Sequence, residues 1–308
     1  MAGFQQLKVT RKVDFTGATK IGMGDYSLGI GKTFYVDMNG ADGGPGTDPN
    51  HPFKTMTAAI DACTASHFDA VVVMQESPST ATTGETWPIA LDTAGVLLTG
   101  LYSRGLISDS GFGPDAIDTD CVVVSADHCA VENLYLQVYT GGTAGNVVAG
   151  PASGGIYGFT MRNCWVGLQH TALYGFHTGD ATDFPYLLIE DCVFSAPNAN
   201  SMTSAIHLFN ASFSVIRRNL FLHCLSYAIH MLENCQSTSV LDNRFDLSAD
   251  SAGFAIQCAA GSRYNFFDGN SAASKDTATS ATVYTDASTA GYNKWGNNYA
   301  GIVAVLAA

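Results

Sequence analysis

Three histidines and a glutamine recur at similar intervals in the second half of the chain. His177, His207, His230 and Gln257 follow one another at spacings of 30, 23 and 27 residues, each as the third residue of a short segment such as Ala205-Ile-His-Leu208. Imidazoles about 5 Å apart on neighbouring strands could share a metal ion or contact a glycan. We therefore take these four residues as candidate ligand-binding residues, although stacking of like residues in a coil is the simpler explanation.

Polysaccharide cleavage would require acids or a base close to these histidines. A glycoside hydrolase uses two carboxylates about 5 to 9.5 Å apart, and a lyase uses a base together with a group that neutralises the sugar carboxylate. An enzyme of either kind would draw its catalytic residues from Asp180, Asp183, His207, His230 and Glu233. These acids do not recur as a pair at the spacing of the histidines. The sequence therefore favours a protein without catalytic residues.

Two groups of acidic residues could hold a calcium ion. Asp37, Asn39 and Asp42 have part of the spacing of a calcium-binding loop, but Ala41 occupies a position that needs a ligand. A second group consists of Asp109, Asp115, Asp118 and Asp120. A solvated turn and a charged loop explain both groups without an ion. We expect no cofactor and no metal, with calcium as the alternative.

Composition and charge exclude several classes of partner. Charged residues make up 13% of the 308 residues, against about 25% in ordinary globular domains, and 32 glycines suit tight turns. The formal charge of −13 argues against nucleic acid, which requires clustered Lys and Arg. No segment has the length of a signal peptide or of a membrane span, so we expect synthesis in a cytoplasm, without secretion by a signal peptide and without a membrane partner. The eight cysteines then suit reduced core positions.

The most informative feature is an internal repeat of six residues. Its starts lie 30, 28, 27, 24 and 26 residues apart, which is the period of stacked coils. The six hexads are Val131-Glu-Asn-Leu-Tyr-Leu136, Met161-Arg-Asn-Cys-Trp-Val166, Ile189-Glu-Asp-Cys-Val-Phe194, Ile216-Arg-Arg-Asn-Leu-Phe221, Val240-Leu-Asp-Asn-Arg-Phe245 and Phe266-Phe-Asp-Gly-Asn-Ser271. The first position is always apolar and the sixth usually is, so both are expected to stack into interior columns.

The middle of each hexad is expected to form a bend. Asn, Asp and Gly are frequent at positions three and four, and these residues tolerate left-handed backbone angles. Asn219 and Asn243 are expected to form an amide ladder between adjacent coils. Alternation along the second strand of each coil would bury Ile206 and point His207 outward, so the histidines and Gln257 would form one exterior column.

These patterns predict an all-β fold, a single-stranded right-handed parallel β-helix. Helical spacing of apolar residues from Lys54 to Cys63, beginning at Thr55 or Thr57, indicates a helix that caps the open end of the coil. We divide the chain into an N-terminal arm (1–32), a first strand with its loop and capping helix (33–66), the β-helix (67–299) and a C-terminal tail (300–308). Exposed aromatic residues that could stack on sugars are Tyr135, Tyr139, Trp165, Tyr174 and Tyr227.

The segment that begins the coil resembles a known family. The run Thr33-Phe-Tyr-Val-Asp37, Pro45-Gly-Thr47, Pro52-Phe-Lys-Thr55 and Ala58-Ala-Ile60 resembles the corresponding segment of pectin-lyase-like β-helix proteins, which include many phage appendage proteins. The resemblance extends over residues 33–299 and implies the fold. It does not imply one activity, because this fold occurs in lyases, hydrolases, esterases and structural virion proteins.

We therefore expect a non-enzymatic phage virion protein, either a capsid decoration or a tailspike-like appendage. The arm would attach to other virion proteins, and the body would form a homotrimer that contacts a surface polysaccharide. One alternative is a polysaccharide depolymerase, acting as a lyase or a glycoside hydrolase. A second alternative is a carbohydrate-binding module.

Overall fold

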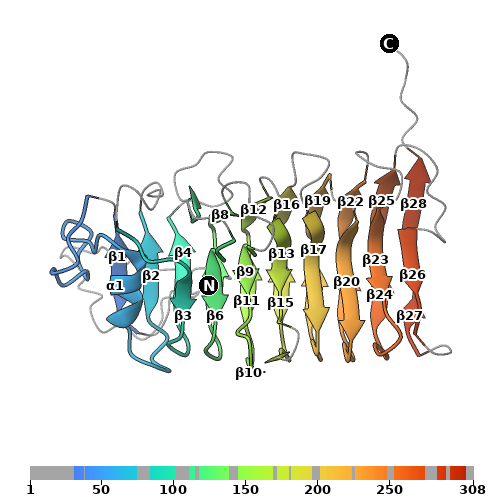
Figure 1. The fold of residues 1–308 in the computed structure, drawn as a ribbon, viewed down its shortest axis with the longest axis horizontal. Coiled ribbons are helices and arrows are strands. Elements are labelled where there is room, and N and C mark those ends of the chain that lie inside the picture. Colours follow the sequence, from blue (N-terminus) through green and yellow to red (C-terminus); the bar gives the residue numbers. More distant parts are fainter. Residues whose placement is uncertain are drawn as a thin grey trace, which may run out of the picture.

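The chain folds into an elongated coil of short parallel strands, as Figure 1 shows. This computed structural model describes residues 31–37, 39–74, 84–101, 111–114, 118–138, 145–168, 172–179, 182–195, 202–223, 226–247, 253–274, 283–288 and 292–302. The strands form a right-handed parallel β-helix, which confirms the fold predicted from the repeats. Among the residues described, no helix is long and apolar enough to cross a membrane.

Three sheets run along the coil, and we name them sheets I, II and III. Sheet I consists of β1 (Thr33–Val36), β2 (Ala70–Val73), β4 (Leu97–Gly100), β7 (Ala130–Glu132), β11 (Thr160–Arg162), β15 (Leu188–Glu190), β18 (Val215–Arg217), β21 (Ser239–Leu241), β24 (Phe266–Asp268) and β27 (Lys294–Trp295). Sheet II consists of β5 (Gly111–Phe112), β8 (Tyr135–Val138), β12 (Trp165–Leu168), β16 (Val193–Ser195), β19 (Leu220–Leu222), β22 (Arg244–Asp246), β25 (Ser271–Ser274) and β28 (Tyr299–Ile302). Sheet III consists of β3 (Ile89–Leu91), β6 (Val122–Val124), β9 (Val148–Ala149), β13 (Ala172–His177), β17 (Met202–Phe209), β20 (Tyr227–Glu233), β23 (Phe254–Cys258) and β26 (Tyr284–Asp286).

From β6 onward, each coil passes from sheet III to sheet I and then to sheet II. Two further short strands, β10 (Gly154–Gly155) and β14 (Thr182–Asp183), pair in the turns between sheets III and I. All of these strand pairs are parallel, so equivalent residues of successive coils lie beside one another.

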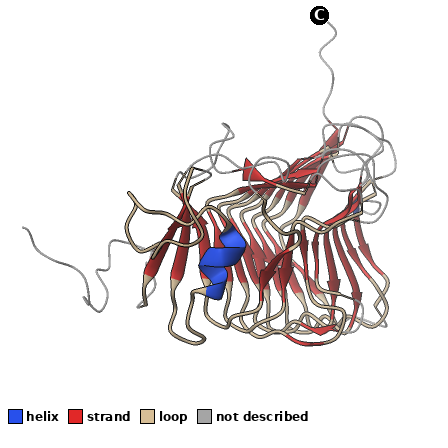
Figure 2. Cartoon of the chain, turned by 60° about the vertical axis from the view of Figure 1, so that its left-hand side comes forward, coloured by secondary structure: helices blue, strands red, loops and turns tan. Residues whose placement is uncertain are grey.

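A short helix covers the N-terminal end of the coil (Figure 2). Helix α1 (Met56–Asp61) begins after Thr55, one of the two expected starts, whose side-chain oxygen accepts a hydrogen bond from the amide of Ala58 at 3.2 Å. A second cap comes from far along the chain, because the carboxylate of Glu85 accepts the amide of Met56 at 2.6 Å. The apolar side of the helix is thereby held against the first coil, as expected for a cap over exposed strand edges.

The interior is filled by columns of equivalent side chains. The first hexad positions from Val131 to Val240 are fully buried, and so are the sixth positions from Leu136 to Phe221, which confirms the expected interior columns. Successive phenylalanines of the sixth column stack face to face: the ring centroids of Phe194 and Phe221 lie 5.1 Å apart, and those of Phe221 and Phe245 lie 4.8 Å apart. The stack follows the coil spacing.

The bend between sheets I and II places the third hexad residue in the left-handed region. The φ angles are 57° at Asn133, 54° at Asn163, 55° at Asp191, 55° at Arg218 and 54° at Asp242. Asn and Asp adopt this conformation at little cost, which explains their frequency at this position.

The fourth hexad residue forms the expected amide ladder. Nδ2 of Asn219 donates to Oδ1 of Asn243 at 3.0 Å, and Nδ2 of Asn243 donates to Oδ1 of Asn270 at 3.0 Å. The ladder continues to Asn298 at 2.8 Å. Asn219, Asn243 and Asn270 are almost completely buried, so each ladder bond forms away from competing water.

The last hexad begins one residue later than the sequence pattern predicts. Strand β24 pairs Val240 with Phe267, so the hexad begins at Phe267 and not at Phe266. The bend residue is then Gly269, with a φ of 67°, and the ladder residue is Asn270. The apolar pattern could not choose between two consecutive phenylalanines, and the repeat is regular here where the sequence suggested degeneration.

Replacing Asn243 by Ala is expected to lower the free energy of unfolding by about 3 to 5 kcal/mol, because several buried groups lose their partners at about 1 to 3 kcal/mol each. These groups include the carbonyl of Ile216, which accepts Nδ2 of Asn243 at 3.1 Å. The half-buried Asn298 ends the ladder, so the groups that Asn298→Ala leaves unpaired lie closer to water, and its cost should be smaller, about 1 to 3 kcal/mol. Guanidinium unfolding followed by circular dichroism measures both. Equal losses would contradict the ladder's role.

Candidate functional site

The histidines lie in one row on sheet III, in the register expected from their spacing. His177 pairs with His207, His207 with His230, and His230 with Gln257. The ring centroids of His177 and His207 lie 5.1 Å apart, and those of His207 and His230 lie 5.2 Å apart. The alignment of these residues is therefore established, while their role in ligand binding stays a prediction.

A second row runs beside the histidines at the start of the same strands. Strand register places its members in the order Asp120, Asn146, Tyr174, Ser204, Tyr227 and Phe254. The ring of Tyr174 stacks on His207 with centroids 4.1 Å apart and planes 11° apart, and Tyr227 stacks on His230 at 4.3 Å. We call the two rows together the aromatic–histidine face.

Tyrosine and histidine reach the same side because the strand bends between them. Tyr174 and His177 are three residues apart, and strict alternation would place them on opposite sides. Phe176 is fully buried, and a side chain at Gly175 would meet the interior ring of Phe194 at 3.0 Å, so both intervening residues face inward. This bend allows Tyr174 to cover the neighbouring His207.

His207 lies in the expected exterior row, but neighbouring side chains cover it. Its exposed fraction is 5%, because the rings of Tyr174 and Phe209 and the two neighbouring histidines surround it. His177, His230 and Gln257 are half-buried. In this conformation a ligand would therefore contact these three residues and the tyrosines before it contacted His207.

Burial keeps the central imidazoles uncharged. It lowers the pKa of His207 to about 3, and the nearby His177 and His230 add to this effect. Burial also lowers the pKa of His230. Nδ1 of each of these two rings and Oγ of Ser204 are buried and have no hydrogen-bond partner among the described residues. His207 and His230 are thus uncharged at physiological pH, and their buried Nδ1 atoms retain unused hydrogen-bonding capacity.

Asp120 joins this face, which the sequence did not indicate. The carboxylate accepts the backbone amide of Asn146 at 2.7 Å and its side-chain amide at 2.9 Å. Burial raises the pKa of Asp120, although the hydrogen bonds from Asn146 and the charge of His177 act in the opposite direction. The sequence grouped Asp120 with the acidic loop, and only the register of β6, β9 and β13 reveals its place.

Among the other acids of the sequence hypotheses, the described ones do not gather at the face. Asp180, Asp109 and Asp115 lie outside the described residues, and Asp118 occupies a turn with a φ of 59°. Asp183 in β14 is exposed, and so is Glu233 at the end of β20. In the described part of the chain, no hydrogen bond or ion pair joins either of these two acids to a histidine of the row.

The acids before helix α1 bond to their own turns. Oδ1 of Asp42 accepts the backbone amides of Lys54 and Thr55, both at 2.8 Å, and Oδ1 of Asp37 accepts the amide of Asn39 at 2.8 Å. Within the described ranges, no group of three or more His, Cys, Asp or Glu side chains is arranged to hold a metal ion.

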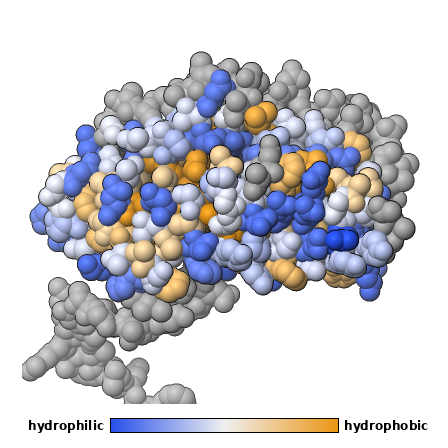
Figure 3. All heavy atoms as spheres, turned by 60° about the horizontal axis from the view of Figure 1, so that its bottom comes forward, coloured by the Kyte–Doolittle hydropathy of each residue, from blue (hydrophilic) through white to orange (hydrophobic). Residues whose placement is uncertain are grey.

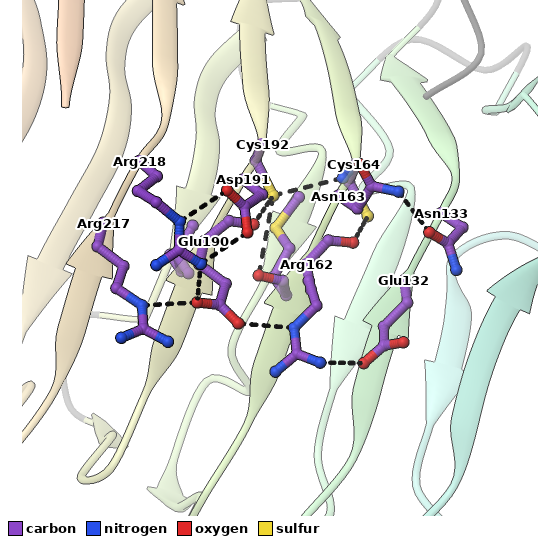
Figure 4. A network of polar contacts seen from close by, with 12 residues as sticks. Glu132, Asn133, Arg162, Asn163, Cys164, Glu190, Asp191, Cys192, Arg217 and Arg218 are labelled. Carbon is purple, nitrogen blue, oxygen red and sulfur yellow. Dashed lines mark hydrogen bonds and ion pairs between the residues drawn. The ribbon is translucent and has the colours of Figure 1, made fainter. Parts of the chain in front are cut away.

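A charged network on the outer face of sheet I is the other concentration of polar side chains (Figure 4). Its members are Glu132, Arg162, Glu190, Asp191, Arg217 and Arg218. Oε1 of Glu190 lies 2.7 Å from Nε of Arg162, and Oε2 lies 2.6 Å from Nε of Arg217. Burial would raise the pKa of Glu190, but the hydrogen bond from Arg217 and the charges of both arginines outweigh it and hold this pKa below its ordinary value.

This network connects four coils and balances its own charges. Arg218 adopts the left-handed bend conformation despite its long side chain, and its guanidinium contacts both carboxylate oxygens of Asp191, at 2.9 and 2.8 Å. The second hexad positions carry this alternation of charge in the sequence. We interpret the network as a structural device that fixes the register of sheet I.

Acid is expected to destabilise the protein partly through His207. Above about pH 6.5 the ring is neutral in both states; between pH 6.5 and about 3 only the unfolded chain takes up the proton, which favours unfolding. The cost is at most about 1.4 kcal/mol per pH unit. His207→Gln, which introduces the residue type of position 257, should weaken this pH dependence. Urea unfolding at pH 7, 5 and 4 measures the free energy of unfolding as a function of pH. The same dependence on pH in wild type and His207→Gln would contradict the role of His207.

Comparison with solved structures shows similarity of fold alone. Pectin methylesterase from Aspergillus niger is 11% identical, with 88% of this chain and 85% of that chain covered and a TM-score of 0.51. Pectate lyase Pel9A is 11% identical, with 87% and 79% covered and a TM-score of 0.46. The Dettilon tailspike protein is 12% identical, with 87% and 68% covered and a TM-score of 0.27. No curated protein sequence matches the chain significantly.

One protein-family model matches most of the chain. It covers residues 38–305, from the loop after β1 to beyond β28, and thus includes the helical cap and the aromatic–histidine face. The family is described as a protein of unknown function. On this match the chain belongs to the DUF1565 family.

Proposed function

We propose that this chain is a non-enzymatic structural protein of a phage virion, a capsid decoration or tailspike-like appendage that contacts a surface polysaccharide. The observation that best supports glycan contact is the aromatic–histidine face. Aromatic rings pack against the apolar faces of sugars, and polar groups beside them bond to hydroxyls. The ring of Tyr227 lies between His230, at 4.3 Å, and Phe254, at 5.3 Å, with the amide of Gln257 on the neighbouring row.

The charges favour a neutral polysaccharide. The chain carries a formal charge of −13, which repels an acidic polymer. Burial keeps His207 and His230 uncharged near neutral pH, so these rings do not attract an anionic polymer. A neutral sugar loses less hydration energy than a charged one when it is bound on such a surface.

A specific observation favours a depolymerase as the second candidate. Asp120 has a raised pKa and lies where it feels the charge of His177, at the edge of the same face. Acids with raised pKa values serve as general acids in sugar cleavage, and perturbed groups concentrate at active sites. In this candidate Asp120 donates the proton to the leaving oxygen.

A panel of soluble polysaccharides separates the two functions. We expect binding of a neutral polymer without release of reducing ends or of unsaturated products. Tyr227→Ala should weaken binding at least tenfold, because one ring of the face is lost, whereas Leu101→Ala, an exposed apolar side chain just after β4, should not change it. Affinity electrophoresis and product assays measure these outcomes. Product formation that disappears in Asp120→Asn would replace the structural function by the enzymatic one.

The outer face of sheet II supports the proposal of a homotrimer. It carries a group of half-buried apolar side chains: Tyr135, Trp165, Val193, Leu220 and Leu222. A shallow groove of about 520 Å³ continues this surface past Leu220 to Tyr299. Broad apolar faces of this kind are usually covered in closed symmetric assemblies.

The arm is proposed to attach the protein to other virion proteins. Of residues 1–32 only Gly31 and Lys32 are described, and the amide of Lys32 donates to Oδ1 of Asp69 at 2.5 Å at the first coil. Lys8, Arg11, Lys12 and Lys20 give the remainder of the arm a basic character that the acidic body lacks. The protein would then reside in the virion after synthesis in the host cytoplasm.

A chain without residues 1–30 is expected to remain a trimer but to be missing from assembled particles. The sheet II surface is intact in this variant, whereas the attachment segment is absent. Mass photometry of the purified chain and immunoblotting of particles measure the two properties. A monomeric full-length protein would contradict the trimer, and incorporation of the shortened chain would contradict attachment through the arm.

A further inference from the structure

The turns from sheet III to sheet I carry a row of exposed aromatic side chains. Eight large hydrophobic side chains are exposed among the described residues, and five of them stand two residues before a strand of sheet I. These five are Phe68, Tyr186, Phe213, Tyr264 and Tyr292, with exposed fractions between 45% and 58%. We call them the turn row. Figure 3 brings this lower edge of the coil forward and shows a mostly hydrophilic surface with separate apolar patches.

The backbone conformation of these turns does not require aromatic residues. The φ angles are 61° at Tyr186, 54° at Phe213 and 61° at Tyr264, a left-handed conformation that bulky residues rarely adopt. Equivalent turns of other coils use Gly158 or Ser237, so small residues satisfy the turn equally well. Exposed rings on strained residues contribute little to folding, and strain of this kind is concentrated at functional positions.

Four of the five rings form two pairs with a gap between them, whereas Phe68 precedes β2 and belongs to neither pair. The centroids of Tyr186 and Phe213 lie 5.6 Å apart with planes 19° apart, and those of Tyr264 and Tyr292 lie 5.3 Å apart. Ser237 occupies the coil between the pairs. Two coil steps separate Phe213 from Tyr264, about 9.6 Å along the axis, which leaves room for one ring of a ligand between them.

Polar groups accompany the second pair. The guanidinium of Arg263 lies 5.8 Å from the ring centroid of Tyr264. A groove of about 260 Å³ beside Tyr292 is lined by Asn234, Ser262 and Arg263 among others. Hydroxyl, amide and guanidinium groups therefore lie next to rings that offer apolar faces.

We propose that the turn row binds a neutral polysaccharide chain that lies along the coil axis. Sugar rings combine apolar faces with hydroxyl edges, which matches separate aromatic rings flanked by polar groups. A protein partner would require about 800 Å² of packed surface on each side, whereas this row is one side chain wide. The inference goes beyond the function proposed above, because the row lies outside the aromatic–histidine face.

The test uses the full-length triple variant Tyr186→Asn, Phe213→Asn and Tyr264→Asn. Asparagine tolerates the left-handed conformation, so the variant is expected to keep the melting temperature of the wild type. The probes are a soluble β-glucan, a galactomannan and dextran. Each is tested with wild type, the triple variant and Leu101→Ala, whose exposed side chain lies outside the row. Affinity electrophoresis should show at least a tenfold loss of affinity for one polymer in the triple variant alone.

The outcomes distinguish this inference from the sheet III proposal. Full binding by the triple variant overturns the proposal that the turn row binds a polysaccharide, even where Tyr227→Ala abolishes binding. Loss of affinity in the triple variant, together with full binding by Tyr227→Ala, supports binding at the turn row and rules out binding at the aromatic–histidine face. A lowered melting temperature with unchanged affinity assigns the row to stability, and wild type that binds none of the three polymers also overturns the inference.

Discussion

The bend between sheets I and II is the constraint on which the whole coil depends. Between sheets I and II each coil must bend within two residues. One residue therefore adopts the left-handed conformation, and the next fills the inside of the corner. From Asn219 onward an asparagine at this corner bonds to its counterpart in the next coil, at 3.0 Å in the first two steps. A slip of one residue would break this ladder and expose the interior columns, so the bend fixes the register of all three sheets.

Fixed register turns isolated residues into rows, and each outer face carries a different chemistry. Sheet I carries charges that neutralise one another around the buried Glu190. Sheet III carries aromatic rings and histidines, of which burial keeps His207 and His230 uncharged. The turns between these sheets carry exposed rings on left-handed residues. A rigid coil can thus present a long binding surface without the cost of ordering it upon binding.

The sequence predicted the features that follow from the repeat spacing. It did not predict those that depend on which of two neighbouring residues faces the interior. The histidine row followed from spacing, but the burial of His207 did not, because Gly175 and Phe176 both turn inward and bring Tyr174 over the ring. The adjacent Phe266 and Phe267 were equally apolar, so the last coil was misaligned and Asn270 was missed. The place of Asp120 arises only from pairing across coils, which no local pattern contains.

We propose that rows created by coil register, and not the loops between sheets II and III, bind the polysaccharide. A crystal structure of the full chain with an oligosaccharide of the best-bound neutral polysaccharide tests it most directly. We expect sugar density that spans several coils along Tyr174 and Tyr227, or along Phe213 and Tyr264. Density confined to the loops between sheets II and III, without contact to either row, would contradict it.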